Sequence, residues 1–297
     1  TVINETFDYV EYLKLKKSID DRSLNSAVWN ELVNRIKSKC QNSGSIFIVE
    51  PGAGIGTMIT RIMDEVLRAK ITFKCAYTAI EPEPGFQTAA ESYLQAWAEK
   101  QNAKFIKLNE QQWQLSKNEM EVTVDWECAA AEDFSQVLAL KSVDLLLAHA
   151  LVDLLPVPEL VPDLMQCLKA DGIFYFSLNY SGQTEFSPGH QSDSLLMQEY
   201  NADMDKRFPD LDWQASHTGN LLPDFLQKQG HTIISEGSSD WELDANGKAF
   251  ILNILDTIKK ALSSSPGIEQ WYAERRDQLE HEKLKLKISN RDLLGEV

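Results

Sequence analysis

Residues 49–56 read Val-Glu-Pro-Gly-Ala-Gly-Ile-Gly, and this stretch decides the fold. The run before it, residues 45–49, is short, apolar and rich in β-branched side chains, which predicts a buried strand. After it, apolar side chains recur at helical spacing from Ile55 to Val66. Alternate glycines between a strand and a helix let the backbone approach a ligand closely, while the start of the helix offers free N–H groups. The stretch therefore predicts a ligand cradle.

The spacing of the glycines narrows the class of ligand. Gly52, Gly54 and Gly56 differ from the dinucleotide pattern GxGxxG, because Thr57 stands where the third glycine is expected. No Gly-Lys-Ser/Thr follows, which excludes a phosphate-binding P-loop. Glu50, two residues before the first glycine, would repel a pyrophosphate but would suit an ammonium or a sulfonium. The turn thus favours a ligand that carries positive charge.

Strands and helices alternate along the following part of the chain. Further strand-like runs cover residues 71–80, 121–128, 143–148 and 173–176, with helical patterns between them. The helix with Leu160, Leu164 and Leu168 is expected to stop at Gly172. This alternation is typical of a parallel sheet with helices on both faces. We expect an α/β fold with a doubly wound, mostly parallel sheet of seven strands in three layers, α/β/α.

The pattern also suggests how the chain is divided. An N-terminal helical segment, residues 1–44, precedes an α/β domain of residues 45–297. Within that domain, residues 179–217 are polar and carry one helical pattern, so we interpret them as an insertion that covers the site like a cap. Residues 247–283 form a second, helical insertion, and residues 284–288 a last strand.

Composition and charge exclude several classes of partner. A formal net charge of −16 disfavours nucleic acid, whose binding needs clustered Lys and Arg. The apolar runs are too short or too charged to span a membrane, and no signal peptide is visible, so a cytoplasmic location is expected. The sequence predicts no metal site, because no CxxC pair is present. The cysteines are expected to be buried free thiols: Cys40, Cys75, Cys128 and Cys167.

The glycine turn resembles the first motif of the class I S-adenosylmethionine-dependent methyltransferases, E/D-x-G-x-G-x-G. Glu50, Gly52, Gly54 and Gly56 match it, and the resemblance extends over roughly residues 45–180. It implies a Rossmann-like fold with S-adenosylmethionine as the cofactor.

The same resemblance implies how the rest of the cofactor is held. Glu81, which closes the second strand beside Pro82, matches the family's acidic residue that binds the ribose. A surface acid at a strand end is the alternative. Glu132, Asp133 and Phe134 resemble the segment in which an acid meets the adenine amino group and an apolar side chain covers the ring. Alternatively, Asp133 caps a helix and Phe134 belongs to the core.

His149 ends the fourth strand, where the ligand crevice of an open α/β sheet lies. It is the catalytic candidate, as a base for the acceptor, with a structural histidine as the alternative. The N/D-P-P-Y/F sequence of enzymes that methylate amino groups of nucleic-acid bases is absent at this strand end, and so is the Pro-Cys of those that methylate base carbon. A nucleic-acid substrate is therefore disfavoured a second time.

Polar side chains further along are candidates for the acceptor site. Asn179, Tyr180 and Tyr200 could face an acceptor, although ordinary packing explains them as well. Tyr12 and Arg22 could reach the cofactor's carboxylate if the first helices fold over the glycine turn; otherwise they lie on the surface.

We expect a methyltransferase that acts on a small-molecule acceptor, with oxygen as one candidate acceptor atom. A protein or RNA methyltransferase, a non-catalytic S-adenosylmethionine-binding protein and a dehydrogenase with an atypical glycine turn remain alternatives. The sequence leaves the acceptor and the oligomeric state open.

Overall fold

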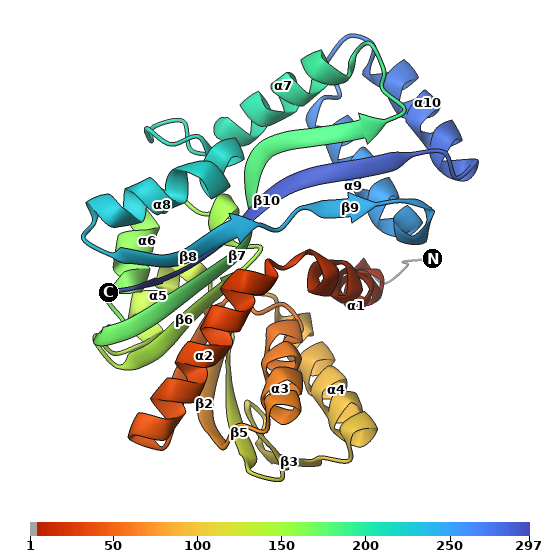
Figure 1. Ribbon diagram of the computed structural model, residues 1–297. Coiled ribbons are helices and arrows are strands. Elements are labelled where there is room, and N and C mark those ends of the chain that lie inside the picture. Colours follow the sequence, from red (N-terminus) through yellow and green to blue (C-terminus); the bar gives the residue numbers. More distant parts are fainter. Residues whose placement is uncertain (1–4) are drawn as a thin grey trace.

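The structure is a computed structural model that describes residues 5–297, and its centre is one sheet of ten strands with helices on both faces (Figure 1). The strands are β1 (Ile46–Pro51), β2 (Phe73–Ile80), β3 (Lys104–Asn109), β4 (Gln112–Lys117), β5 (Met120–Glu127), β6 (Val143–His149), β7 (Leu168–Ser187), β8 (Thr232–Ser238), β9 (Trp241–Leu243) and β10 (Lys285–Glu296). The α-helices are α1 (Glu5–Ser23), α2 (Ser26–Ser43), α3 (Thr57–Ala69), α4 (Pro84–Gln101), α5 (Phe134–Val137), α6 (Val157–Met165), α7 (Asp193–Asp205), α8 (Thr218–Lys228), α9 (Lys248–Ala261) and α10 (Ile268–Glu280).

The sheet is mixed, with a parallel centre. Its order is β3-β4-β5-β2-β1-β6-β7-β10-β8, with β9 beside β10. The five strands from β5 to β7 are parallel, whereas β3, β4 and β10 pair antiparallel with their neighbours. The α/β class is confirmed, but the expectation of seven mostly parallel strands is wrong. It missed the β3–β4 hairpin, because β3 buries neither face, β4 buries only one, and both lack the long apolar run of a fully buried strand.

Helices cover the two faces of the sheet as separate layers. The apolar sides of α2, α3 and α4 pack into one core on one face, around Leu32, Ile62 and Leu94. The short α5 together with α6 and α8 pack into another core, around Val161 and Leu222. This arrangement places the carboxyl ends of β1, β2 and β6 at one edge, where an open α/β sheet binds ligands.

The N-terminal helices are joined to the sheet by a buried aspartate. Asn25 caps α2, and its own N–H donates to Asp292 Oδ2 of β10 at 2.8 Å. The other oxygen, Asp292 Oδ1, accepts the N–H of Leu178 in β7, also at 2.8 Å. Asp292 thus fixes the connection between α1 and α2 against the sheet. α1 lies between β9 and the α3–α4 pair (Figure 1).

β7 and β10 run on together beyond the parallel centre and support a further group of helices. β7 has 20 residues, and its pairing with β10 continues to Ser187 and Lys285. In Figure 1, α7, α9 and α10 gather around this extension, where they share a third core that includes Leu255 and Trp271. We call the extension of β7 and β10 with β9, α7, α9 and α10 the cap.

Several predicted boundaries change as a result. Leu168 begins β7 and does not continue the preceding helix, which ends at Met165. Residues 179–187 belong to β7, and only the later part of the predicted insertion holds the expected helix, α7. The two helices predicted within residues 247–283 are confirmed as α9 and α10.

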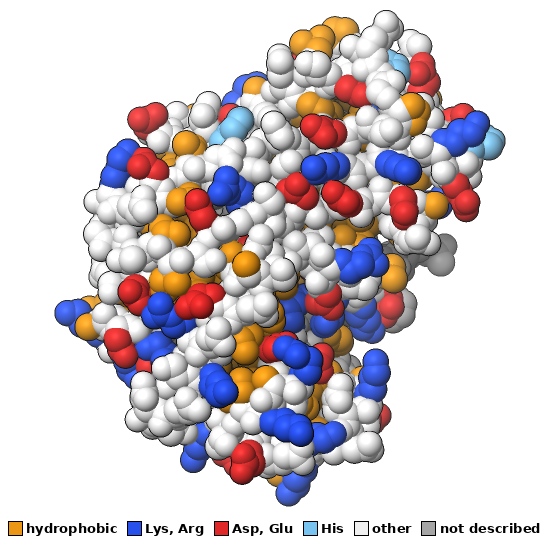
Figure 2. All heavy atoms as spheres, viewed as in Figure 1, with side chains coloured by type: hydrophobic (Ala, Val, Ile, Leu, Met, Phe, Trp, Pro, Cys, Tyr) orange, Lys and Arg blue, Asp and Glu red, His pale blue; other side chains and the backbone are white. Residues whose placement is uncertain are grey.

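The surface carries the charge that the composition implies. Acidic and basic side chains are interspersed over the face shown in Figure 2. In the part of the chain that the structure describes, no helix is both long and apolar enough to cross a bilayer. Three cysteines are buried as expected, but Cys128 is exposed, because it follows the end of β5.

Candidate active site

The glycine turn lies at the carboxyl end of β1 and has the backbone that its sequence predicts. Gly52, Gly54 and Gly56 all have positive φ, at 67°, 58° and 83°. L-residues rarely adopt these values, so glycine is required there. A Cβ added to Gly52 would lie 2.8 Å from Leu151 Cδ1, whereas one on Gly54 would find only Leu13 Cδ1, at 3.7 Å. The turn therefore presents bare backbone toward the space in front of it.

Glu81 is fixed beside this turn. Its Oε2 accepts the Gly54 N–H at 2.9 Å, and its Oε1 accepts the Glu83 N–H at 3.1 Å. Burial raises the pKa of Glu81, although the two N–H groups oppose that rise. A carboxylate held at both oxygens by backbone cannot rotate away, and its remaining lone pairs are available to hydroxyl groups.

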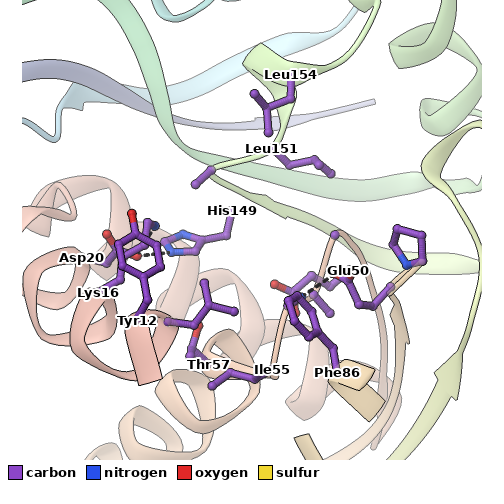
Figure 3. Close-up of a pocket in the computed structure, with 17 residues that line it drawn as sticks. Tyr12, Lys16, Asp20, Glu50, Ile55, Thr57, Phe86, His149, Leu151 and Leu154 are labelled. Atoms are coloured by element: carbon purple, nitrogen blue, oxygen red, sulfur yellow. Dashed lines mark hydrogen bonds and ion pairs between the residues drawn. The ribbon is translucent and has the colours of Figure 1, made fainter. Parts of the chain in front are cut away.

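A cavity of about 320 Å³, the first cavity, opens in front of the turn (Figure 3). Glu50, Glu81 and His149 reach it from the ends of β1, β2 and β6. Pro82 and Phe86 form an apolar wall. The whole lining set is Tyr12, Leu13, Lys16, Asp20, Glu50, Gly52, Ala53, Gly54, Ile55, Thr57, Glu81, Pro82, Phe86, His149, Ala150, Leu151 and Leu154.

Glu50 is the most deeply buried acid of this cavity, with 2% of its surface exposed. It accepts a hydrogen bond from the Tyr77 hydroxyl. Burial raises the pKa of Glu50 to about 8, although the Tyr77 bond and the charge of Arg61 oppose this. A permanent cation placed beside the carboxyl would favour its ionised form. Glu50 therefore suits a positively charged ligand.

α1 forms the opposite wall through a chain of hydrogen bonds that ends on the sheet (Figure 3). Lys16 Nζ lies 2.8 Å from Asp20 Oδ2, and His149 Nε2 lies 3.0 Å from the same oxygen. His149 Nδ1 lies 2.8 Å from Ser177 Oγ in β7. Asp20 Oδ1 accepts the Trp241 Nε1–H at 3.0 Å, which links the chain to β9 in the cap. We call Asp20 and His149 the clasp.

The clasp fixes the protonation of both partners. Burial alone would raise the pKa of Asp20, but the charge of Lys16 and the His149 bond hold that pKa well below its usual range. Burial lowers the pKa of His149 to about 4, although Asp20 opposes this. Neutral His149 must then donate Nε2–H to the Asp20 carboxylate, which only accepts, so its Nδ1 accepts from the Ser177 hydroxyl. Both ring nitrogens are occupied.

A second cavity, of about 330 Å³, adjoins the first. The two cavities share Lys16, Ala150 and Leu154, so these residues surround the junction. Ala150 has a φ of 50° although it is not glycine, a strained backbone of a kind that collects at functional sites. The second cavity lies between the sheet and the cap, with these lining residues: Lys16, Ala150, Asp153, Leu154, Leu178, Tyr180, Thr184, Tyr200, Met204, Arg207, Ala215, Trp241, Ile254, Thr257, Ile288 and Asn290.

The structure brings many of the predicted site residues together. Tyr12, Glu50, the turn glycines 52 and 54, Glu81, Pro82 and His149 line the first cavity, and Tyr180 and Tyr200 line the second. Gly56 instead starts α3 as its N-cap residue, with a φ of 83°.

Besides Gly56, five further predicted residues lie outside both cavities. Asn179 is buried, and its Nδ2 donates to the carbonyl oxygens of Phe176 and Arg291, at 3.0 Å each. Arg22, Glu132 and Asp133 are exposed, while Phe134 packs into the core of α6 and α8. Asp133 is the N-cap residue of α5, although its side chain makes no capping bond.

Two charged residues of α1 line the first cavity without having been predicted: Lys16 and Asp20. They follow Tyr12 at intervals of four residues, so all three share one helix face. This four-residue spacing could have predicted that Lys16 and Asp20 lie beside Tyr12. Arg22, two positions beyond Asp20, points elsewhere for the same reason.

Together, the α/β sheet, the glycine turn with its preceding acid and the acid that closes β2 define a class I S-adenosylmethionine-binding protein. Residues 28–280 match the model of a family described as "Putative S-adenosyl-L-methionine-dependent methyltransferase". The match covers well over half of the chain, so this protein belongs to that family, and S-adenosylmethionine is its cofactor. Among proteins with curated descriptions, none matches the chain.

Several solved structures resemble the chain at low sequence identity. A "putative methyltransferase" from Bacillus halodurans C-125 is 12% identical over 88% of this chain and 96% of its own, with a TM-score of 0.49. The YcgJ protein from Bacillus subtilis is 12% identical over 90% and 97%, with a TM-score of 0.48. A S-adenosylmethionine-dependent methyltransferase from Geobacter sulfurreducens, in complex with S-adenosylhomocysteine, is 9% identical over 89% and 90%, with a TM-score of 0.43. At these values the resemblances carry no argument about the acceptor.

Proposed function

We propose that this protein transfers a methyl group from S-adenosylmethionine, bound in the first cavity, to a small-molecule acceptor bound in the second. The observation that carries the proposal is the junction, where Lys16, Ala150 and Leu154 line both cavities. Methyl transfer needs the acceptor and the sulfur in line, and two adjoining cavities can supply that arrangement.

The residues of the first cavity fit the cofactor part by part. The bare backbone at Gly52 and Gly54 leaves room for its amino-acid portion, and Glu50 suits its positive charge. The fixed carboxylate of Glu81 can accept the ribose hydroxyls, beside the apolar wall of Pro82 and Phe86 for the base. When bound, the cofactor supplies a methyl group on a positively charged sulfur. A contact of Asp133 or its neighbours with the adenine stays a prediction.

His149 fits a positioning role better than the predicted role as a base. Both of its ring nitrogens already have partners, and its pKa of about 4 makes it a weak base. Through Asp20 it holds α1 against the first cavity. We infer that His149 organises the cofactor wall.

The second cavity favours a small acceptor and turnover over the alternatives. A volume of about 330 Å³ is at the lower end of the range for small-molecule sites, roughly 300–1,000 Å³. A binding module without turnover would need no such space beside the cofactor. The acidic charge of the chain argues against RNA.

Calorimetry with S-adenosylmethionine tests the proposal at Glu81. Glu81→Ala removes the charged acceptor of the two ribose hydroxyl groups. We therefore expect the affinity for S-adenosylmethionine to fall roughly 10- to 100-fold. Glu83→Ala is the matched control, because its exposed side chain lies next to the site but only its N–H contacts Glu81. Equal affinities of the two variants, or no binding by the unmodified chain, would contradict the proposal.

A further inference from the structure

Asp153 is a half-buried acid that lines the second cavity. It lies in a short 3-10 turn, Val152–Leu154, between β6 and α6. Its Oδ2 accepts the Tyr180 N–H at 3.1 Å, which fixes the carboxylate against β7. A carboxylate offers about four acceptor positions, and the Tyr180 amide takes one of them. Asp153 is therefore held in place with capacity for a ligand.

The neighbouring groups that could take a proton are already occupied. His149 has partners at both ring nitrogens, and Asp20 accepts from Lys16, His149 and Trp241. Among the described residues that line the second cavity, Asp153 is the only carboxylate. Burial raises the pKa of Asp153, although the Tyr180 N–H and the charge of Arg207 oppose this. A raised pKa makes a carboxylate a better proton acceptor.

The walls of the second cavity select the body of the ligand. Leu178, Met204, Ile254 and Ile288 line it together with the aromatic rings of Trp241 and Tyr200. Apolar and aromatic walls favour a ligand with an apolar, ring-shaped body. A volume of about 330 Å³ suits one or two fused rings.

The charges of the same cavity select the head group. The lining holds charges of both signs, Asp153 against Lys16 and Arg207, so a head group of either charge meets a like charge as well as an opposite one. Like charges at such positions oppose binding. A neutral hydroxyl avoids both conflicts and can donate a hydrogen bond to Asp153.

We propose that the second cavity binds a neutral aromatic alcohol of one or two rings, and that Asp153 accepts the proton of its hydroxyl group during methylation. This inference rests on the proposed function. The hydroxyl oxygen forms a bond to the methyl carbon, and the carbon–sulfur bond breaks with its electron pair left on sulfur. The hydroxyl proton passes to Asp153 and from there to water. The products are an aryl methyl ether and the neutral thioether S-adenosylhomocysteine.

A matched set of naphthalenes tests the head group without turnover. Calorimetry on the S-adenosylhomocysteine complex compares 2-naphthol with its methyl ether and with 2-naphthoate. We expect 2-naphthol to bind best and to lose roughly 10- to 100-fold in affinity in Asp153→Ala, because a hydrogen bond to a charged acceptor is lost. The methyl ether donates no hydrogen bond, so it should bind the unmodified chain and Asp153→Ala with equal affinity. Asp210→Ala, an exposed aspartate outside both cavities, is the control.

Turnover then separates binding from proton transfer. Asp153→Asn keeps a hydrogen-bond acceptor, so it should bind 2-naphthol but form the methyl ether roughly 100-fold more slowly or worse. Equal binding of 2-naphthol to Asp153→Ala, stronger binding of 2-naphthoate than of 2-naphthol, no binding of any probe, or full turnover by Asp153→Asn would each overturn the inference. If S-adenosylhomocysteine binds and the naphthalenes fail, only this inference falls; if neither S-adenosylhomocysteine nor S-adenosylmethionine binds, the proposed function falls.

Discussion

Glu50 shows how a single buried side chain couples pH to both stability and cofactor binding. Its pKa rises from 4.5 to about 8 because burial penalises the charged form. Between these values the unfolded chain has lost the proton and the folded chain has kept it. The free energy of unfolding contributed by Glu50 therefore falls as pH rises, by up to about 1.4 kcal/mol per pH unit. Below about pH 6.5 the buried neutral His149, with a pKa of about 4, acts in the opposite direction.

Glu50→Gln should remove this dependence. From pH 6.5 to pH 8, urea unfolding should show that the unmodified chain loses between about 1 and 2 kcal/mol more than the variant does. In the unmodified chain, binding of the positively charged cofactor should also release a proton, because it favours ionised Glu50. Calorimetry in buffers of different ionisation enthalpy measures that release. Parallel stability curves, or the same proton release from the variant, would refute this role of Glu50.

The glycines of the turn were predictable because their role depends on a backbone conformation that other residues rarely adopt. Positive φ at Gly52 and Gly54 requires glycine, so the requirement shows directly in the sequence. Glu81 was predictable for a similar reason, since one helix and one strand separate it from the turn and parallel strands end at the same edge. The buried position of Asn179 was not predictable, because it depends on pairing with a strand that lies more than a hundred residues further along the chain.

α1 is the element through which the clasp acts on the first cavity. It contributes Tyr12, Leu13, Lys16 and Asp20 to the lining, and the hydrogen bond between Asp20 and His149 joins it to the parallel sheet. The position of α1 could not be predicted from its sequence, because its apolar and polar residues are not separated into two faces. The β3–β4 hairpin was missed too, although Trp113 and Leu115 of β4 alternate with polar residues in the pattern of a half-buried strand.

Asp20→Asn should loosen α1 and weaken cofactor binding. The variant loses the charge that pairs with Lys16 and cannot serve all three of its donors as an acceptor. We expect faster amide hydrogen exchange in α1 and about tenfold weaker binding of S-adenosylmethionine. Glu11→Gln, which removes an exposed ion pair of the same helix, should leave both unchanged.

The same measurement on His149→Ala distinguishes its two possible roles. A positioning residue would lose affinity for S-adenosylmethionine and protection of α1, as Asp20→Asn does. A base would keep both and lose only turnover. Unchanged exchange in α1 for both variants would contradict the clasp.

At the scale of the whole molecule, the cap and the parallel sheet have separate cores, which are joined by β7 and β10 and by α1, whose Ile19 packs in the third core. The third core lies around β7 and β10 beyond the parallel centre and includes Tyr180 of the second cavity. The helices of the cap were predictable from their periodicity. Their assembly was not, because the sequence of β7 indicated a strand of ordinary length that ends near residue 176. In the structure β7 is 20 residues long, and its pairing with β10 continues across the cap boundary.

A buried ion pair anchors the cap. The fully buried Arg275 of α10 donates Nη2 to both oxygens of Asp193 at the start of α7, at 2.5 Å each. Its Nη1 donates to the Pro188 carbonyl oxygen at 2.7 Å. Trp271 Nε1 donates to the same Asp193 at 2.8 Å. Removal of one partner of such a pair leaves an uncompensated buried charge, which costs about 3–5 kcal/mol.

Arg275→Ala should therefore destabilise the cap and spare the cofactor site. We expect the lost ion pair to raise hydrogen exchange in α7, α9 and α10. S-adenosylmethionine should still bind, because the turn at Gly52–Gly56 and Glu81 belong to the parallel sheet and His149 still holds α1 through Asp20. Binding of 2-naphthol in the second cavity should fall, since Tyr180, Tyr200 and Ile254 come from the cap. Arg276→Ala changes an exposed neighbour on the same helix and should alter neither measurement. If the variant lost both S-adenosylmethionine binding and the hydrogen-exchange protection of the cap, the two cores would instead unfold as one unit.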